Sequence, residues 1–191
     1  MTDPTLPELI ANSWARERPD LADSALGLTV RIRALAMVLD HEIGSIASRE
    51  GIQTDDLMLL FALRRVGPPY CLRPTDIYGV LNVTSGAATY RIERLVKAGL
   101  SIRITDPDDR RSYLLQISEH GMEVIDRCVD ALADASDRAL AAVDFDAVHM
   151  VALKASLRLL EQGWEAIVPM DENPLSRGEG ALLQGPRSGR R

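Results

Sequence analysis

Apolar residues recur every three or four positions along three long stretches of the chain, and this spacing places them on one face of an α-helix. The first stretch runs from Ser24 to Gly51, with apolar positions at Leu28, Ile32, Leu35, Leu39, Ile43 and Ile46. The second follows Ser118 in near-heptad spacing, at Met122, Ile125, Val129, Leu132, Ser136, Ala139 and Val143. The third contains Met150, Leu153, Leu157, Leu160, Trp164 and Ile167. Together they predict three long amphipathic helices.

Three shorter helices are predicted between the first two stretches, over residues 55–66, 74–81 and 85–98. Pro74 suits the first position of a helix, Thr84 or Ser85 suits an N-cap, and Gly99 supplies a left-handed stop. Residues 82–84 form a three-residue turn between the last two of these helices. Two helices of this length joined by such a turn are typical of a helix-turn-helix.

Residues 100–105 and 113–118 alternate between apolar and polar positions, which predicts two strands. The charged segment 106–112 joins them, so the pair forms a β-hairpin. A hairpin that directly follows a helix-turn-helix is a wing. A further short extended segment is predicted at 70–73.

These elements predict a mainly α fold with a small β-hairpin wing, in the α+β class. A winged helix-turn-helix lobe is expected over 54–118. Residues 24–53 and 119–168 are expected to form a helical dimerisation region, because their apolar stripes need a second copy of the chain to cover them. Residues 1–23 are expected to be a partly ordered segment with at most a short helix. The Gly-, Pro- and Arg-rich residues 169–191 are expected to be a disordered tail.

The formal net charge of the chain is −6, but the charges are unevenly distributed. Residues 84–118 contain six basic and four acidic side chains, whereas residues 119–168 contain four basic and ten acidic ones. Attraction to phosphate depends on local charge, so the basic middle segment suits a nucleic-acid partner. No apolar run approaches the roughly 18 to 20 residues of a membrane span, and no signal peptide is apparent. We expect a cytoplasmic protein without a membrane partner.

Cys71 and Cys128 are far apart in sequence, and His41, His120 and His149 are singly placed. This spacing predicts no metal site and no cofactor, and both cysteines are expected to be free thiols that pack as small apolar residues. The motifs GxGxxG, P-loop, HExxH and GxSxG are missing from the sequence, so it favours a protein that is not an enzyme.

The most specific stretch of the sequence begins at the end of the predicted helix 85–98. It reads Leu95-Val-Lys-Ala-Gly-Leu-Ser-Ile-Arg103, then Asp106-Pro-Asp-Asp-Arg-Arg111, then Ile117-Ser-Glu-His-Gly121. In this order and spacing, the chain resembles the multiple-antibiotic-resistance regulator (MarR) family over roughly residues 28–167. The resemblance implies a homodimeric DNA-binding transcriptional regulator, by family default a repressor.

Two positions depart from the family pattern. The family commonly has Thr-Arg in the middle of the recognition helix, where this chain has Thr89-Tyr90. A tyrosine cannot form the bidentate pair with guanine that an arginine forms. Ser101 stands where Val or Ile is usual, which affects only packing.

The N-terminal half of a recognition helix enters the major groove of DNA. Four apolar side chains of residues 85–98 are expected to face inward: Ala88, Ile92, Leu95 and Val96. Four residues on the outer face are the candidates to read base edges: Ser85, Gly86, Thr89 and Tyr90. Three further residues are candidates for phosphate contacts, the last near the N-terminus of its helix: Arg91, Arg94 and Thr75.

At the tip of the predicted wing, Arg110 and Arg111 are candidates to contact DNA, and Arg111 is expected to reach the minor groove. The resemblance implies that Asp109 pairs with Arg103 and thereby holds the arginine side chain extended. The alternative is that Arg110 and Arg111 belong to an ordinary solvated turn.

A two-fold dimer predicts a near-palindromic operator whose half-sites lie about one helical turn (10 to 10.5 base pairs) apart, or a multiple of that. The resemblance also implies release from double-stranded DNA by a small aromatic or anionic effector, with Trp14, Arg31 and His41 as candidate contacts. The alternative for these three residues is packing for Trp14 and plain surface positions for the other two. The alternative function for the whole chain is a winged-helix protein–protein interaction module without specific DNA binding.

Overall fold

The computed structural model describes residues 4–21 and 24–168 of the 191-residue chain. Its elements in order are α1 (Leu6–Glu17), the 3-10 helix η1 (Pro19–Leu21), α2 (Leu26–Arg49), α3 (Thr54–Arg65), β1 (Cys71–Leu72), α4 (Pro74–Val80), α5 (Ser85–Lys97), β2 (Ser101–Thr105), β3 (Tyr113–Ile117), α6 (Glu119–Ala141) and α7 (Ala147–Ile167). The predicted fold class, mainly α with a small β-hairpin wing, is confirmed. The expected disordered tail, residues 169–191, lies outside the described residues.

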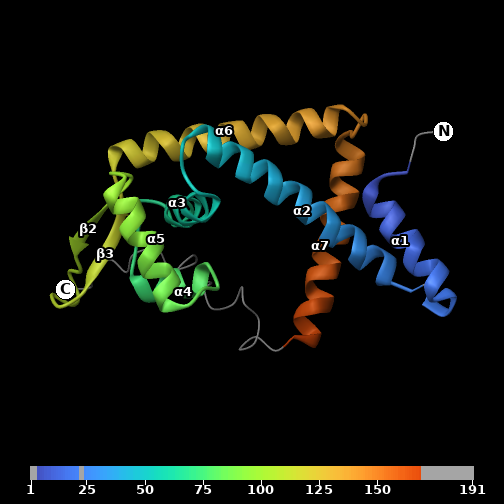
Figure 1. Cartoon of the computed structure of the whole chain (residues 1–191), viewed down its shortest axis with the longest axis horizontal. Coiled ribbons are helices and arrows are strands. Elements are labelled where there is room, and N and C mark those ends of the chain that lie inside the picture. Colours follow the sequence, from blue (N-terminus) through green and yellow to red (C-terminus); the bar gives the residue numbers. More distant parts are fainter. Residues whose placement is uncertain (1–3, 22–23, 169–191) are drawn as a thin grey trace.

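The helices form a lobe and an extension from it (Figure 1). The lobe contains α3, α4, α5 and the strands. Helices α2 and α6 both leave the lobe on the same side, and α7 and α1 lie at their far ends. This arrangement sets the helix-turn-helix and its hairpin apart from the long amphipathic helices.

The sheet of the lobe has three antiparallel strands in the order β1-β3-β2. Ser101 pairs with Ile117 and Thr105 with Tyr113, so β2 and β3 form the predicted wing hairpin. The short segment predicted to be extended at 70–73 contains β1, whose Cys71 pairs with Gln116. The hairpin is thereby fixed to the residues that immediately precede α4.

Helix α3 lies at the centre of the lobe. Five of its side chains are fully buried: Leu57, Leu59, Leu60, Ala62 and Leu63. They belong to one apolar cluster that also contains residues of α4, α5, α6 and β3. Burial of a single leucine side chain stabilises a fold by about 1.5–3 kcal/mol, so this helix holds the surrounding elements together.

Side-chain caps set the starts of the two helices that flank the wing. Thr84 Oγ1 accepts a hydrogen bond from the Ala87 N–H (3.3 Å), which identifies Thr84 and not Ser85 as the cap of α5. Ser118 Oγ accepts from the Gly121 N–H (2.9 Å) and donates to the Gly99 carbonyl (2.6 Å). Ser118 thus ties the beginning of α6 to the turn at the end of α5.

The extension leaves much apolar surface exposed. Not one described residue of α7 is buried, and Val151, Leu159 and Ile167 are each about 70% exposed or more. Exposed leucines and isoleucines also lie on α1 and on the first half of α2. None of the described helices is both long enough and apolar enough to cross a membrane.

Glycine at position 121 is required by close packing between α6 and the start of β2. A Cβ atom there would overlap the backbone carbonyl of Leu100, a group that cannot move without displacing the strand. By contrast, a Cβ atom on Gly86 would meet no heavy atom within 4 Å.

We therefore expect Gly121→Ala to lower the free energy of unfolding by about 1–3 kcal/mol, the usual cost of overpacking. Gly86→Ala serves as the control and leaves the stability unchanged or slightly raised, because alanine is the better helix former. Urea unfolding followed by circular dichroism, at one protein concentration, measures both. Equal stability of Gly121→Ala and wild type would contradict the close contact.

Candidate nucleic-acid interface

Helix α5 presents one apolar face to the core and one polar face to solvent. Ala88, Ile92 and Leu95 are buried and Val96 is half-buried, as predicted. The residues expected to read bases, Ser85, Gly86, Thr89 and Tyr90, are all exposed. The Thr89 hydroxyl donates to the Ser85 carbonyl within the helix (2.8 Å), so its proton is already engaged.

Two arginines of α5 are bound by consecutive aspartates in the first turn of α3. Arg91 Nη2 lies 2.9 Å from Asp55 Oδ2, and Arg94 Nη2 lies 2.7 Å from Asp56 Oδ1. The Arg94 Nε–H also donates to Asp56 Oδ1 (3.1 Å). Asp56 is buried, and its hydrogen bond raises the pKa of Arg94. These pairs fix the orientation of α5 against α3.

The Arg94 guanidinium in turn lies over the ring of Tyr90, with its carbon 5.1 Å from the ring centroid. Tyr90 precedes Arg94 by one helical turn, the spacing at which side chains on a helix meet. A cation over an aromatic face is attracted by the ring electrons. Tyr90 is therefore supported from the C-terminal side while 61% of it remains exposed.

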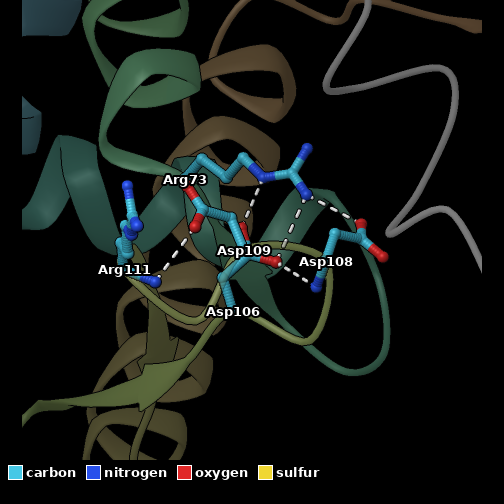
Figure 2. A network of polar contacts seen from close by, with 5 residues as sticks. All are labelled: Arg73, Asp106, Asp108, Asp109 and Arg111. Atoms are coloured by element: carbon cyan, nitrogen blue, oxygen red, sulfur yellow. Dashed lines mark hydrogen bonds and ion pairs between the residues drawn. The ribbon is translucent and has the colours of Figure 1, made fainter.

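The segment between β2 and β3 is organised by Arg73, the N-cap residue of α4 (Figure 2). Its Nε–H donates to Asp106 Oδ2 (2.7 Å), and its Nη2 donates to Asp108 Oδ2 (2.8 Å). Asp106 Oδ1 also accepts from the Asp108 N–H (2.9 Å). The side chain of Asp106 is only 1% exposed. The network thus fastens the wing tip to the start of the helix-turn-helix.

Arg110 and Arg111 follow this network and are both exposed. Within the described residues neither guanidinium has a carboxylate within ion-pair distance, whereas Arg73 engages two of the three aspartates in the segment. The third, Asp109, accepts through Oδ1 from the Arg111 N–H (3.0 Å). The three carboxylates thus have partners other than the guanidiniums of Arg110 and Arg111, and these two guanidiniums remain exposed.

Residues 50–112 match a family model described as the MarR family. The HTH-type transcriptional regulator PecS of Dickeya dadantii is 29% identical over 121 residues, which cover 63% of this chain and 73% of PecS. The multiple antibiotic resistance protein MarR of Salmonella typhimurium is 26% identical over 109 residues, 57% of this chain and 74% of that protein. Over this part of its length the chain is therefore similar to regulators of the MarR family. Members of this family are transcription regulators and not enzymes.

Solved structures share the fold. The crystal structure of wild-type MarR from E. coli in its apo form has a TM-score of 0.59 and 23% identity, over 71% of this chain and 95% of that chain. A mutant of E. coli MarR complexed with operator DNA has a TM-score of 0.59 and 22% identity, over 73% of this chain and 97% of that chain. At this identity the likeness shows that both chains have the MarR fold.

The predicted pair between Arg103 and Asp109 is not formed in this structure. Arg103 lies on the ring of Tyr113, with its guanidinium carbon 4.9 Å from the centroid. Asp109 instead accepts from a main-chain N–H two residues ahead, the local hydrogen bond that aspartate favours in turns. The ion pairs of the wing are made by Arg73, which sequence reasoning missed.

The predicted phosphate contacts by Arg91 and Arg94 also conflict with the observed pairing. Their side chains are only 15% and 29% exposed, and their charges are matched by Asp55 and Asp56. The acidic residues in the first turn of α3, Asp55 and Asp56, are the signal in the sequence that points to this pairing. Thr75 is exposed in the first turn of α4, as expected.

The three candidate effector residues do not converge. Trp14 is half-exposed on α1, and Arg31 of α2 lies 3.8 Å from Glu8 of α1. His41 is exposed further along α2. Its ten-residue separation from Arg31 corresponds to about 15 Å of helix. An effector site formed by all three is therefore not supported by their placement.

Both cysteines are buried in the lobe, and burial raises the pKa of each thiol. A raised pKa disfavours the thiolate that reacts with oxidants, which agrees with their predicted packing role. Across residues 4–21 and 24–168, no group of three or more metal-ligating side chains is placed to hold a metal ion.

The Arg73 network makes stability depend on pH. The hydrogen bond from Arg73, with that from the Asp108 N–H, lowers the pKa of Asp106. A lowered folded-state pKa adds stability above the ordinary value of about 3.9, and this stability is lost as the pH falls through the folded-state value.

At pH 7 we expect Asp106→Asn to lower the unfolding temperature by a few degrees, because Arg73 loses its charged partner. The difference from wild type should shrink as the pH falls below about 3.9 towards the lowered folded-state pKa of Asp106, because protonation of the carboxyl then favours the unfolded chain. Asp130→Asn, a change at an exposed position of α6, is the control. Thermal unfolding measured across this pH range tests the prediction. A difference in unfolding temperature that does not change with pH would exclude an ionised Arg73–Asp106 pair.

Proposed function

We propose that the chain is a transcriptional regulator that binds double-stranded DNA in a sequence-specific manner. The observation that carries the proposal is the exposed Arg110–Arg111 pair at the tip of the wing that follows α5. The aspartates of the same segment are held by Arg73 and by the Arg111 N–H, and none of them is paired with the guanidinium of Arg110 or Arg111. A wing with two free guanidiniums next to a helix-turn-helix suits phosphate and minor-groove contacts.

In this proposal α5 enters the major groove with its N-terminal half, and the wing segment 106–112 lies at the minor groove. Ser85, Gly86 and Tyr90 are the residues of α5 best placed to approach base edges. Arg91 and Arg94 are assigned to holding α5 and not to phosphate contacts, since each is already paired. Arg103 lies along the wing and contributes positive charge.

The regulator is proposed to be a homodimer. Large apolar side chains are exposed along α1, α2 and α7, and gathered exposed apolar residues mark interaction surfaces. A second copy of the chain brings the same helices and covers them symmetrically. Two lobes then face two half-sites of a near-palindrome.

Repression and release by a small aromatic or anionic effector are proposed from the family alone. A bound regulator blocks transcription by occupying its operator, and an effector releases it only if it binds the DNA-free arrangement more tightly. Titration of the protein–DNA complex with candidate aromatic acids tests the second part.

The wing prediction concerns Arg111→Ala. This variant should bind the operator with an affinity lower by roughly 1–3 kcal/mol, and the salt dependence of binding should become less steep. Fluorescence anisotropy with DNA from upstream of the gene, over a series of salt concentrations, measures both effects. Arg138→Ala removes the same charge from the far end of α6 and should bind like wild type. Weak binding that ignores both DNA sequence and Arg111 would favour the protein–protein interaction module instead.

The dimer prediction concerns Leu157→Glu on the apolar stripe of α7. A buried, unpaired carboxylate is costly, so this variant should dissociate into monomers at concentrations where wild type is dimeric. Gln162→Glu adds the same charge at an exposed polar position of α7 and should leave the dimer intact. Sedimentation velocity distinguishes the species. A wild-type chain that is monomeric at micromolar concentration would contradict the dimer.

A further inference from the structure

The phenol of Tyr90 is the most prominent side chain on the exposed face of α5. It is 61% exposed, whereas Arg91 and Arg94 on the same helix are drawn towards α3. Its position is the sixth residue of α5, within the half of the helix that a winged helix-turn-helix inserts into the major groove.

Two side chains, one behind the other, hold the Tyr90 ring in place. Buried Asp56 fixes Arg94 through contacts of 2.7 and 3.1 Å, and the Arg94 guanidinium lies against the Tyr90 ring. The support comes from the core, so the ring is oriented before any DNA arrives. An aromatic side chain held in this way loses little rotamer entropy on binding.

The surface next to the ring is open. Gly86 lies one turn before Tyr90, and a Cβ atom there would have no neighbour within 4 Å. The Thr89 hydroxyl donates its proton to the Ser85 carbonyl. The centre of the exposed face of α5 therefore presents the flat ring of Tyr90 next to the uncovered backbone at Gly86. It contains few hydrogen-bond donors that are not already engaged.

The group on the major-groove base edges that takes apolar contacts is the C5-methyl group of thymine, whereas the polar groups there are donors and acceptors. A flat ring that cannot make a bidentate pair with guanine gains most from that methyl group. We propose that Tyr90, positioned by Asp56 and Arg94, reads one thymine methyl in each operator half-site. This inference rests on the proposed function and adds the base that α5 recognises.

The test compares thymine with deoxyuridine, which lacks only the methyl group. Duplexes bound by the purified full-length protein are first selected from a random-sequence library. Each T·A pair of the selected site is then replaced in turn by dU·A. For wild type, one position per half-site should weaken binding about fourfold, the change that one buried methyl group produces. The other replacements should have little effect.

Protein variants assign this loss to the ring. Tyr90→Ala should bind thymine and deoxyuridine duplexes equally at that position, whereas Tyr90→Phe should keep the preference. Arg94→Lys retains a charge for Asp56 but has no planar guanidinium to support the ring, so the preference should fall while the unfolding temperature changes little. Glu93→Ala, at an exposed position of α5, is the matched control.

Two results would overturn the role of Tyr90: no dU·A replacement weakens binding of the wild-type protein, or the affinity loss persists in Tyr90→Ala. Either result would leave the proposed function, sequence-specific DNA binding, in place. Failure of the wild-type protein to enrich any sequence from the library would overturn the proposed function and this inference together.

Discussion

The burial of α3 is the constraint on which the rest of the lobe depends. Five of its side chains have no exposed surface, and they contact α4, α5, α6 and β3 within one cluster. Its first turn binds Arg91 and Arg94 of α5, and near its other end the Arg64 Nε–H donates to Asp126 of α6 (2.8 Å). One short helix therefore sets the relative orientation of the recognition helix and the long helix that leads to the extension. A shift of either would require α3 to move or an ion pair to break.

The charges of the lobe follow a similar logic. Four acidic groups near α5 and in the wing are paired with arginines from neighbouring elements. Asp55 and Asp56 are satisfied by α5, and Asp106 and Asp108 by Arg73. Among the described residues, the guanidiniums of Arg110 and Arg111 have no carboxylate partner, because Arg73 holds Asp106 and Asp108 and a main-chain N–H holds Asp109.

The extent to which the sequence predicted this structure depends on whether a feature is local. Apolar periodicity predicted the long helices, and Thr84 and Ser118 were recognisable as caps because a cap involves residues three apart. The wing was also predictable, because apolar and polar residues alternate on either side of a polar turn.

The sequence could not predict which charged side chains pair with each other, because Arg73 and Asp106 are 33 residues apart and Arg94 and Asp56 are 38 residues apart. The Arg103–Asp109 pair failed for a related reason: an aspartate in a turn has a main-chain N–H closer than any guanidinium. The candidate effector residues were implied by the resemblance, and the rise of α2 separates Arg31 from His41 by about 15 Å.

A dimeric regulator that reads DNA through paired winged lobes makes a direct claim about the shape of its complex. Hydroxyl-radical footprinting on DNA from upstream of the gene, with purified full-length protein, measures that shape. For a dimeric regulator we predict two protected segments related by two-fold symmetry, on one face of the duplex, and separated by about one helical turn or a multiple of it. A single unsymmetrical segment, or no protection at protein concentrations that saturate binding, would contradict it.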